Sequence, residues 1–107
     1  MELQIVAADR ARKVDASLRC DGAQESARGF AGADAHELCR AATALAPFLA
    51  RAPDPDRACT QIYGGPQTAR ITGTIGGRRI DRSFSRTDGC RISDWDRAKQ
   101  LLPLDVK

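Results

Sequence analysis

Four cysteines in a chain of 107 residues constrain the fold more than any other feature of this sequence. They stand far apart, at Cys20, Cys39, Cys59 and Cys90, and no two of them form a Cys-x-x-Cys pair. This spacing disfavours a zinc site and a dithiol redox site, which commonly use such pairs. An even number of cysteines in a short chain is typical of a disulfide framework. We therefore expect two structural disulfides, no bound metal and no cofactor.

The composition explains why the chain needs such cross-links. Hydrophobic residues make up 42% of it but aromatic residues only 5%, so one thin core is expected within a single domain spanning 1–107. Because disulfides persist in oxidising compartments, we expect a secreted protein. Residues 1–4 lack the basic and apolar regions of a signal peptide, so we expect Met1 to stand in place of a removed one. No apolar run approaches the ~18 residues of a membrane helix.

The first half of the chain predicts two strands and a helix. Residues 3–6 are a short strand candidate, and apolar and polar residues alternate over 14–20, which is typical of a half-buried strand. Residues 22–32 are small, polar and without period, which predicts a loop with Phe30 as a local anchor. A helix is expected over 35–49, with Asp34 as its N-cap. Pro47 should end or kink this helix.

The second half contains a hairpin signal. Gly76-Gly77 supplies the positive φ of a two-residue turn, which would pair Ile75 with Arg78 and Ala69 with Phe84. This register places the apolar residues on one face, with Arg82 as an exception that we expect to reach water at the sheet edge. Ser-x-x-Asp at 93–96 then predicts the start of a short helix that Pro103 stops. The order of elements indicates an α+β fold, an antiparallel sheet with helices packed against it.

The sequence contains few residues in patterns typical of catalysis, and we expect that the protein is not an enzyme. His36 is the only histidine and lies on the predicted helix, far in sequence from Ser83 and Ser85. Gly76-Gly77-Arg78-Arg79 lacks the Lys-Ser/Thr of a phosphate-binding loop. Arginines crowd the hairpin, but without interleaved aromatic residues they are better explained as a solvated sheet face than as a nucleic-acid site.

The segment from Arg57 to Pro66 has no strong period and lies between a Pro/Asp-rich linker, 52–56, and the hairpin. Such flanks predict an exposed, extended loop held at both ends. A protease could bind such a loop as an added strand, and a loop held to the core could not separate its new ends after cleavage. Alternatively, Cys59 merely stabilises a small core, and spacing alone does not separate the two interpretations.

Specific residues connect this loop to a known family. Cys59-Thr60-Gln61-Ile62-Tyr63, the following Pro66, the hairpin residues Gly73, Gly77 and Arg78-Arg79-Ile80, and then Phe84-Ser85 and Cys90 resemble the Streptomyces subtilisin inhibitor family. Leu18-Arg19-Cys20 and Leu38-Cys39 resemble the first cysteine pair of that family. The resemblance covers roughly residues 3 to 95 and is strongest around the loop.

The resemblance implies a secreted actinobacterial protein that inhibits subtilisin-like serine proteases by a substrate-like, slow-turnover mechanism. It implies a five-stranded antiparallel sheet with two helices, a homodimer, and the disulfides Cys20–Cys39 and Cys59–Cys90. The reactive-site bond would be Gln61–Ile62, with Gln61 in the primary specificity pocket of the enzyme. Cys59 and Thr60 would contact the enzyme before this bond, and Ile62, Tyr63 and Gly64 after it.

Two residues of the loop depart from the family pattern. Thr60 stands where proline is frequent, and Gln61 stands where methionine, lysine or arginine is familiar. Gln61 is neither a large apolar anchor nor a cation, so the target enzyme is open. An exposed glutamine is also the residue type that a transglutaminase uses as acyl donor. A non-inhibitory binding module or a transglutaminase substrate of the same fold is therefore the alternative hypothesis.

Overall fold

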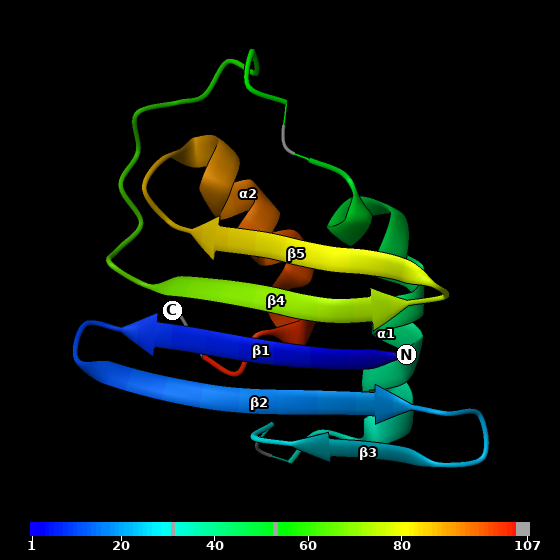
Figure 1. Ribbon diagram of the computed structural model, residues 1–107. Helices are drawn as coiled ribbons and strands as arrows, with labels where there is room; N and C mark the ends of the chain where they lie inside the picture. The colour runs from blue at the N-terminus through cyan, green and yellow to red at the C-terminus, as the bar shows by residue number, and fades with distance from the viewer. Residues whose placement is uncertain (31, 53, 105–107) are drawn as a thin grey trace.

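The computed structural model describes residues 1–30, 32–52 and 54–104. Within them the chain forms a five-stranded antiparallel sheet and two α-helices, an α+β fold (Figure 1). The strands lie in the order β3-β2-β1-β4-β5, so that β3 and β5 form the two edges. The elements are β1 (Glu2–Asp9), β2 (Arg12–Cys20), β3 (Glu25–Arg28), α1 (Ala35–Ala50), β4 (Thr68–Ile75), β5 (Arg78–Ser85), α2 (Gly89–Ala98) and the 3-10 turn η1 (Lys99–Leu101).

Both helices lie on the same face of the sheet, behind it in Figure 1. Alternation along each strand sends one set of side chains toward the helices and the other toward solvent. The core between sheet and helices includes the fully buried side chains of Leu3, Ile5, Leu18, Leu38, Leu49, Ile71, Ile80, Trp95 and Leu101. In the part of the chain that the structure describes, no helix combines the length and apolarity needed to span a bilayer.

The hairpin formed by β4 and β5 has the register that the sequence predicts. Ile75 pairs with Arg78 and Ala69 with Phe84 across the turn at Gly76 and Gly77. Both glycines have positive φ, 55° and 81°, as a two-residue turn of this kind requires. The predicted strands near the N-terminus are also confirmed, and both are longer than the sequence pattern indicated.

The prediction that residues 22–32 form only a loop is wrong, because β3 lies within them. This strand pairs with β2, Leu18 facing Ala27 and Cys20 facing Glu25. At an edge, polar side chains can remain exposed while the backbone bonds to one neighbour, so the strand lacks a strong hydrophobic signal. Phe30 is half-buried and packs against the core, as predicted for a local anchor.

The helix α1 does not end at Pro47 but continues to Ala50. Proline inside a helix costs about 3 kcal/mol. Phe48 and Leu49, which follow it, are 5% and 2% exposed, and burying two such side chains contributes roughly 1.5–3 kcal/mol each. Packing of the last turn therefore offsets the cost of the proline. Asp34 is the N-cap residue, as predicted, but its side chain makes no capping hydrogen bond.

The second helix begins earlier than predicted. α2 starts at Gly89, and its N-cap is Asp88, whose carboxylate accepts a hydrogen bond of 3.0 Å from the backbone N–H of Arg91. The Ser-x-x-Asp pattern at 93–96 lies inside the helix. Two capping patterns stand five residues apart in this segment. The earlier one is used, and it brings Cys90 into the first turn of the helix.

The prediction that Arg82 reaches water is also wrong. Its side chain is only 6% exposed and lies under the C-terminal end of α1. Nη1 donates hydrogen bonds to the carbonyl oxygens of Phe48 (2.8 Å) and Arg51 (3.0 Å). β5 is an edge strand, but the end of α1 covers it at this position. The free carbonyl groups at the helix end accept hydrogen bonds from the charged guanidinium.

Candidate functional site

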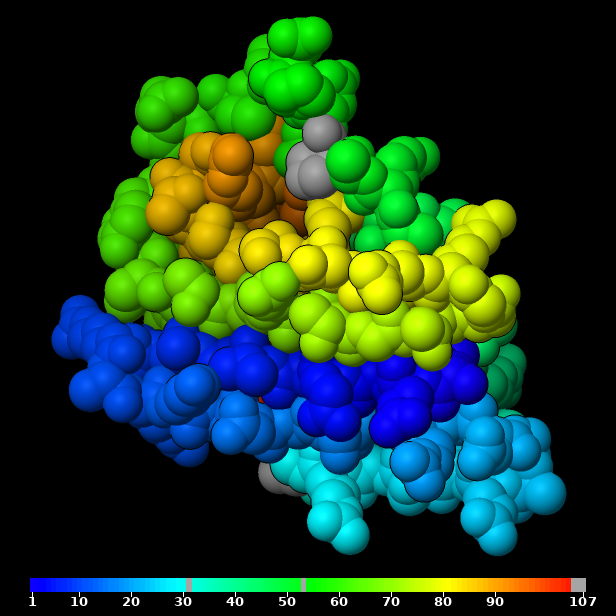
Figure 2. All heavy atoms as spheres, viewed as in Figure 1, coloured from blue at the N-terminus to red at the C-terminus, as the bar shows by residue number. Residues whose placement is uncertain are grey.

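The connection between α1 and β4 stands away from the sheet. In Figure 1 it arches beyond β5 and returns past the N-terminal end of α2, and Figure 2 shows its atoms at the margin of the molecule above that helix. Residues 57–65 form neither helix, strand nor turn. Gln61 is exposed, and the side chains of Ile62 and Tyr63 are 60% and 66% exposed. Large apolar residues at such exposure are a surface that a partner could bury.

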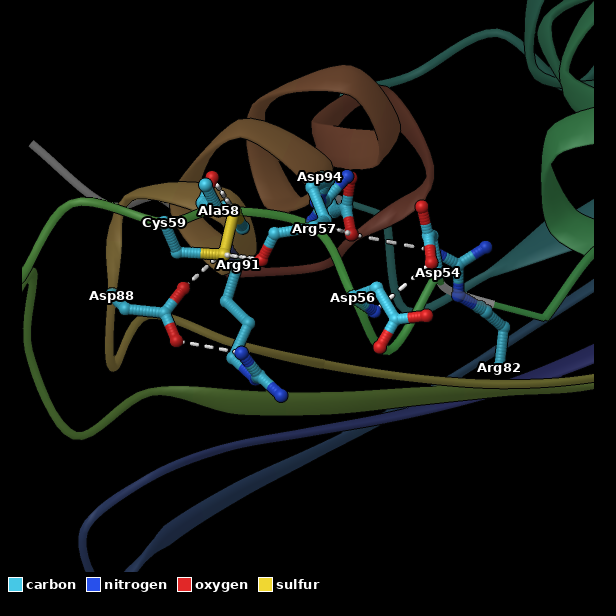
Figure 3. The surroundings of a disulfide bond; sticks show 10 residues. Asp54, Asp56, Arg57, Ala58, Cys59, Arg82, Asp88, Arg91 and Asp94 are labelled. Atoms are coloured by element: carbon cyan, nitrogen blue, oxygen red, sulfur yellow. Dashed lines mark hydrogen bonds and ion pairs between the residues drawn. A yellow bond between two sulfur atoms is a disulfide. The ribbon is translucent and has the colours of Figure 1, made fainter.

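A disulfide holds the loop on the N-terminal side of these residues. Cys59 is bonded to Cys90 in the first turn of α2 (Figure 3), and Cys20 at the end of β2 is bonded to Cys39 in α1. Both pairings agree with those implied by the resemblance. Next to the loop disulfide, the backbone N–H of Gly89 donates a 2.9 Å hydrogen bond to the carbonyl of Thr60. A Cβ atom at position 89 would overlap Oγ1 of Thr60, so a larger residue here would force the Thr60 side chain to move.

A second anchor holds the loop on the C-terminal side. The backbone N–H of Gly64 donates a 2.7 Å hydrogen bond to the carbonyl of Arg86. Nε of Arg86 in turn donates to the carbonyl of Gly64 at 3.4 Å. Among the residues that the structure describes, none forms a hydrogen bond with Gln61, Ile62 or Tyr63. These three residues therefore form an exposed segment between two fixed points, Thr60 and Gly64.

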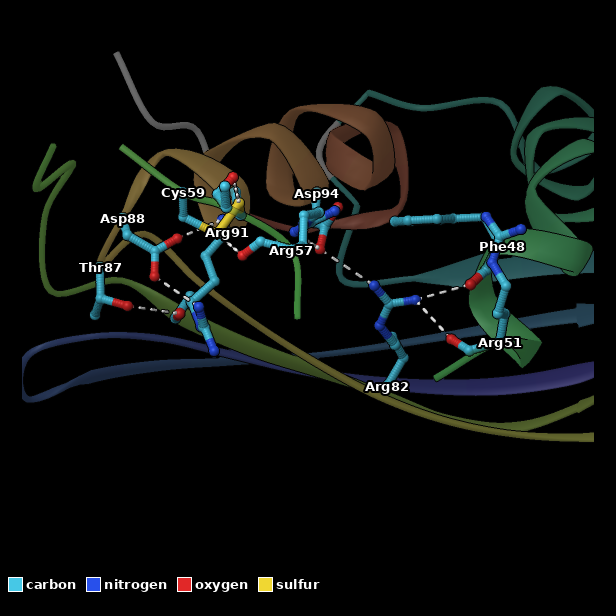
Figure 4. Close-up of polar contacts among 12 residues, drawn as sticks. Phe48, Arg51, Arg57, Cys59, Arg82, Thr87, Asp88, Arg91 and Asp94 are labelled. Carbon is cyan, nitrogen blue, oxygen red and sulfur yellow. Dashed lines mark hydrogen bonds and ion pairs between the residues drawn. A yellow bond between two sulfur atoms is a disulfide. The ribbon is translucent and has the colours of Figure 1, made fainter. Parts of the chain in front are cut away.

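Ion pairs connect the beginning of the loop with the core (Figure 4). Arg57 donates two hydrogen bonds, of 3.2 and 3.0 Å, to the carboxylate of Asp94 in α2. The same carboxylate accepts a 3.3 Å hydrogen bond from the buried Arg82. The hydrogen bond with Asp94 raises the pKa of Arg57, whereas burial lowers the pKa of Arg82. Asp94 thus joins the loop to β5 and, through Arg82, to the end of α1.

The residues considered for catalysis do not come together in the fold, and the candidate metal ligands form no metal site. His36 is exposed on α1, with Nδ1 2.9 Å from a carboxylate oxygen of Glu25. Ser83 is exposed on the opposite, outer face of the sheet. Within the described residues, the one cluster of potential metal ligands is Cys59, Asp88 and Cys90. Its two sulfur atoms are joined in the disulfide, so neither is a thiolate that could bind a metal.

A groove of about 900 Å³ lies on the outer face of the sheet beside the linker. Val6, Ala8 and Phe84 contribute its apolar surface. The three arginines at the groove are each paired with an aspartate, Arg57 with Asp94 as described above, Arg91 with Asp88 and Arg70 with Asp81. Because these charges are already neutralised, we assign no ligand to the groove.

The N-cap of α2 is a titratable carboxyl group, and we expect it to make the stability of the protein depend on pH. The hydrogen bond from the backbone N–H of Arg91 holds the pKa of Asp88 below its usual value. A carboxyl whose folded pKa is depressed contributes stability above its unfolded pKa, about 3.9. That stability is lost as the pH falls through the folded value.

We therefore expect Asp88→Ala to be less stable than the wild type at pH 7, with a difference that shrinks steadily below pH 4. Urea unfolding at a series of pH values measures this difference. Asp88→Asn is the matched control, because asparagine also caps helices but does not titrate. A wild-type advantage over Asp88→Ala that is the same at pH 7 and pH 2.5 would contradict the expectation.

Sequence reasoning placed the loop but missed most of the residues that hold it. Gly89, Arg86 and Asp94 come from elements at least 20 residues further along the chain, and no local pattern marks them as partners of the loop. Their roles follow from tertiary structure alone. A glycine directly after an N-cap aspartate was the single local signal, since glycine permits close backbone approach.

The fold and the site together define a disulfide-cross-linked α+β protein that displays a doubly anchored, exposed loop. No protein-family model matches the sequence, and no curated protein matches it. Among solved structures, the chain is similar to sermetstatin from Streptomyces caespitosus, whose crystal structure is in complex with Bacillus licheniformis subtilisin. The similarity covers 87% of this chain and 86% of that chain, at 22% sequence identity and a TM-score of 0.44.

Proposed function

We propose that this protein inhibits subtilisin-like serine proteases and binds them through loop 59–66, with Gln61–Ile62 as the reactive-site bond. The observation that carries the proposal is the exposed segment Gln61-Ile62-Tyr63 between the fixed points Thr60 and Gly64. The resemblance of Cys59-Thr60-Gln61-Ile62-Tyr63 to the inhibitor family supports the same assignment. Secretion is part of the proposal, because both disulfides need an oxidising compartment.

In the proposed mechanism, the loop adds to the substrate-binding edge of the protease as an extended strand. Main-chain hydrogen bonds then provide affinity, and the side chain of Gln61 enters the specificity pocket. A loop that is already ordered loses little conformational entropy on binding. After cleavage, the disulfide at Cys59 and the hydrogen bonds of Gly64 keep the new ends near each other. Hydrolysis therefore has to compete with religation, and the enzyme stays occupied.

The direct test is titration of a subtilisin with the purified protein. We expect protease activity to fall to near zero at about one equivalent, with an intact complex visible by native mass spectrometry. Rapid cleavage after Gln61 without loss of activity would reject inhibition and favour the alternative of a non-inhibitory module. Incorporation of an amine at Gln61 by a transglutaminase tests the other alternative.

The side chain at position 61 should set the specificity. We expect Gln61→Met to tighten subtilisin binding about tenfold, since a better-matched apolar side chain is worth ~1–3 kcal/mol in such a pocket. Gln61→Lys should add inhibition of trypsin. Inhibition constants for both proteases measure the changes.

Gln4 provides the matched control for these substitutions. It is an exposed glutamine on β1, on the outer face of the sheet. Gln4→Met and Gln4→Lys should leave both inhibition constants as they are in the wild type. If the variants at position 61 behave like those at position 4, Gln61 does not enter the pocket.

A further inference from the structure

The two sides of the proposed reactive-site bond are held by different kinds of anchor. The chain that ends at Gln61 is fixed covalently, because Cys59 lies two residues before the end and is bonded to α2. The chain that begins at Ile62 has no such bond before β4 starts at Thr68. Its first fixed point is Gly64, held by hydrogen bonds. Retention of the new amino end therefore depends on what holds Gly64.

Arg86 forms hydrogen bonds with Gly64 through its own backbone and through its side chain. Its carbonyl accepts the hydrogen bond from the Gly64 N–H (2.7 Å), and its Nε donates to the Gly64 carbonyl (3.4 Å). The Arg86 side chain is only 12% exposed although it carries a charge. The guanidinium is thus largely removed from water, and its long hydrogen bond to the Gly64 carbonyl supplements the shorter backbone bond.

Two residues of α2 fix the position of the guanidinium. Its Nη1 lies 3.5 Å from a carboxylate oxygen of Asp96, and its Cζ lies 5.7 Å from the centre of the Trp95 ring. Trp95 is 2% exposed and belongs to the core. Arg86 therefore connects the second anchor of the loop to the packed interior, as the disulfide does for the first anchor.

We propose that Arg86 is a positioning residue that retains the amino end created at Ile62, so that the cleaved bond can re-form. The inference rests on the proposed function. In the forward step, the serine oxygen of the protease attacks the Gln61 carbonyl carbon, the bond to the Ile62 nitrogen breaks, and that nitrogen takes up a proton. In the reverse step, the deprotonated amine attacks the acyl-enzyme carbonyl carbon, and the serine oxygen leaves and regains its proton. The reverse step needs the amine to stay near the acyl carbon, and holding Gly64 limits how far it can move.

The test compares Arg86→Met with the wild type. Methionine keeps an apolar stem against Trp95 but cannot donate to Gly64. A catalytic amount of subtilisin is incubated with intact protein and, separately, with cleaved protein until both reach the same ratio of cleaved to intact chains. We expect this ratio to rise about threefold in Arg86→Met, because the variant loses the 3.4 Å side-chain bond to the Gly64 carbonyl but keeps the 2.7 Å backbone bond. Arg86→Lys, which keeps a donor, should lie between the two.

Arg79→Met is the matched control, because Arg79 is an exposed arginine near the start of β5 and far along the strand from the loop. It should leave the ratio unchanged. A purely structural role for Arg86 would lower the melting temperature without moving the cleaved-to-intact ratio. An unchanged ratio in Arg86→Met, in a variant that still folds and inhibits, would therefore overturn the inference.

A measurement without protease separates this inference from the proposed function. Exchange of the Gly64 amide hydrogen, followed by NMR, reports whether the second anchor loosens. We expect roughly threefold faster exchange at Gly64 in Arg86→Met, because the backbone carbonyl at position 86 still accepts the amide hydrogen but the side chain no longer holds the Gly64 carbonyl. Arg79→Met should not change the exchange rate. If the wild type does not inhibit a subtilisin, the proposed function fails whatever the exchange rate is. If it inhibits but Gly64 exchanges equally in both variants, the role of Arg86 alone fails.

Discussion

Replacing both cysteines of the loop, Cys59→Ser with Cys90→Ser, is expected to convert the protein from an inhibitor into a substrate of the same protease. The disulfide joins residues separated by 31 positions, and in the chain-entropy model its loss costs roughly 3–4 kcal/mol of stability. The larger effect should be on turnover. Without the covalent anchor, the acyl side of the cleaved loop is held mainly by the hydrogen bond between Gly89 and Thr60. Its end can then leave before religation.

The chain contains its own control for this experiment. Cys20→Ser with Cys39→Ser removes the other disulfide, which spans 19 positions and joins β2 to α1, away from the loop. The chain-entropy model gives it a similar value, about 3 kcal/mol. We expect this variant to lose stability but to inhibit normally at temperatures where it is folded. The measurements are urea unfolding and the rate at which each variant is cleaved by subtilisin.

Comparison of the two double variants distinguishes two roles of the loop disulfide. It either holds the cleaved loop in place or only contributes to the stability of the whole fold. If loss of Cys59–Cys90 and loss of Cys20–Cys39 change the cleavage rate equally, global stability accounts for the effect. If the variant without Cys59–Cys90 inhibits with wild-type potency, the loop does not need its covalent anchor. The proposed mechanism would then have to rely on the hydrogen bonds at Thr60 and Gly64 alone.

Substitution of Arg82 by methionine is expected to lower the free energy of unfolding by about 3 kcal/mol. Removing one partner of a buried ion pair typically costs 3–5 kcal/mol. The low end applies here because Asp94 keeps its bonds with Arg57. The carbonyls of Phe48 and Arg51 would lose the guanidinium that now satisfies them. The Arg82 guanidinium also lies 4.5 Å from the centre of the Phe48 ring, a cation–π contact that methionine cannot make.

Arg70→Met is the matched control for Arg82→Met. Arg70 is on the neighbouring strand β4 and makes two hydrogen bonds with Asp81, but both side chains are more than half exposed. An exposed pair of this kind contributes little to stability. Urea unfolding of both variants should give a large loss for Arg82→Met and almost none for Arg70→Met. Equal losses would show that burial under α1 is not what makes Arg82 important.

The parts of the fold that local sequence patterns predict are those governed by near neighbours. Alternation of apolar and polar residues along β4 and β5, with two glycines between them, is sufficient to set every pair of the hairpin. The same holds for α1, whose apolar stripe includes the buried Leu38, Ala42 and Leu49. The position of the exposed loop also follows from its neighbours, the Pro/Asp linker and the hairpin. In each case, the deciding interactions lie within a few residues along the chain.

The errors have a common physical origin in distant contacts. The edge strand β3 forms because β2 offers it backbone partners. Arg82 is buried because the end of α1 covers it and supplies carbonyl acceptors. The residues adjacent in sequence do not predict either of these features.

The sequence alone thus determined the strands β1, β2, β4 and β5, the helix α1 and the displayed loop, since periodicity and turn residues act locally, whereas β3 and the start of α2 escaped it. It also indicated two disulfides, whose pairing was implied by the family resemblance. Tertiary structure decided how the loop is held, because Gly89, Arg86 and Asp94 reach it only after the sheet and α2 have packed together. The physical reason is that anchoring depends on distances between elements remote in sequence, which local propensities do not encode.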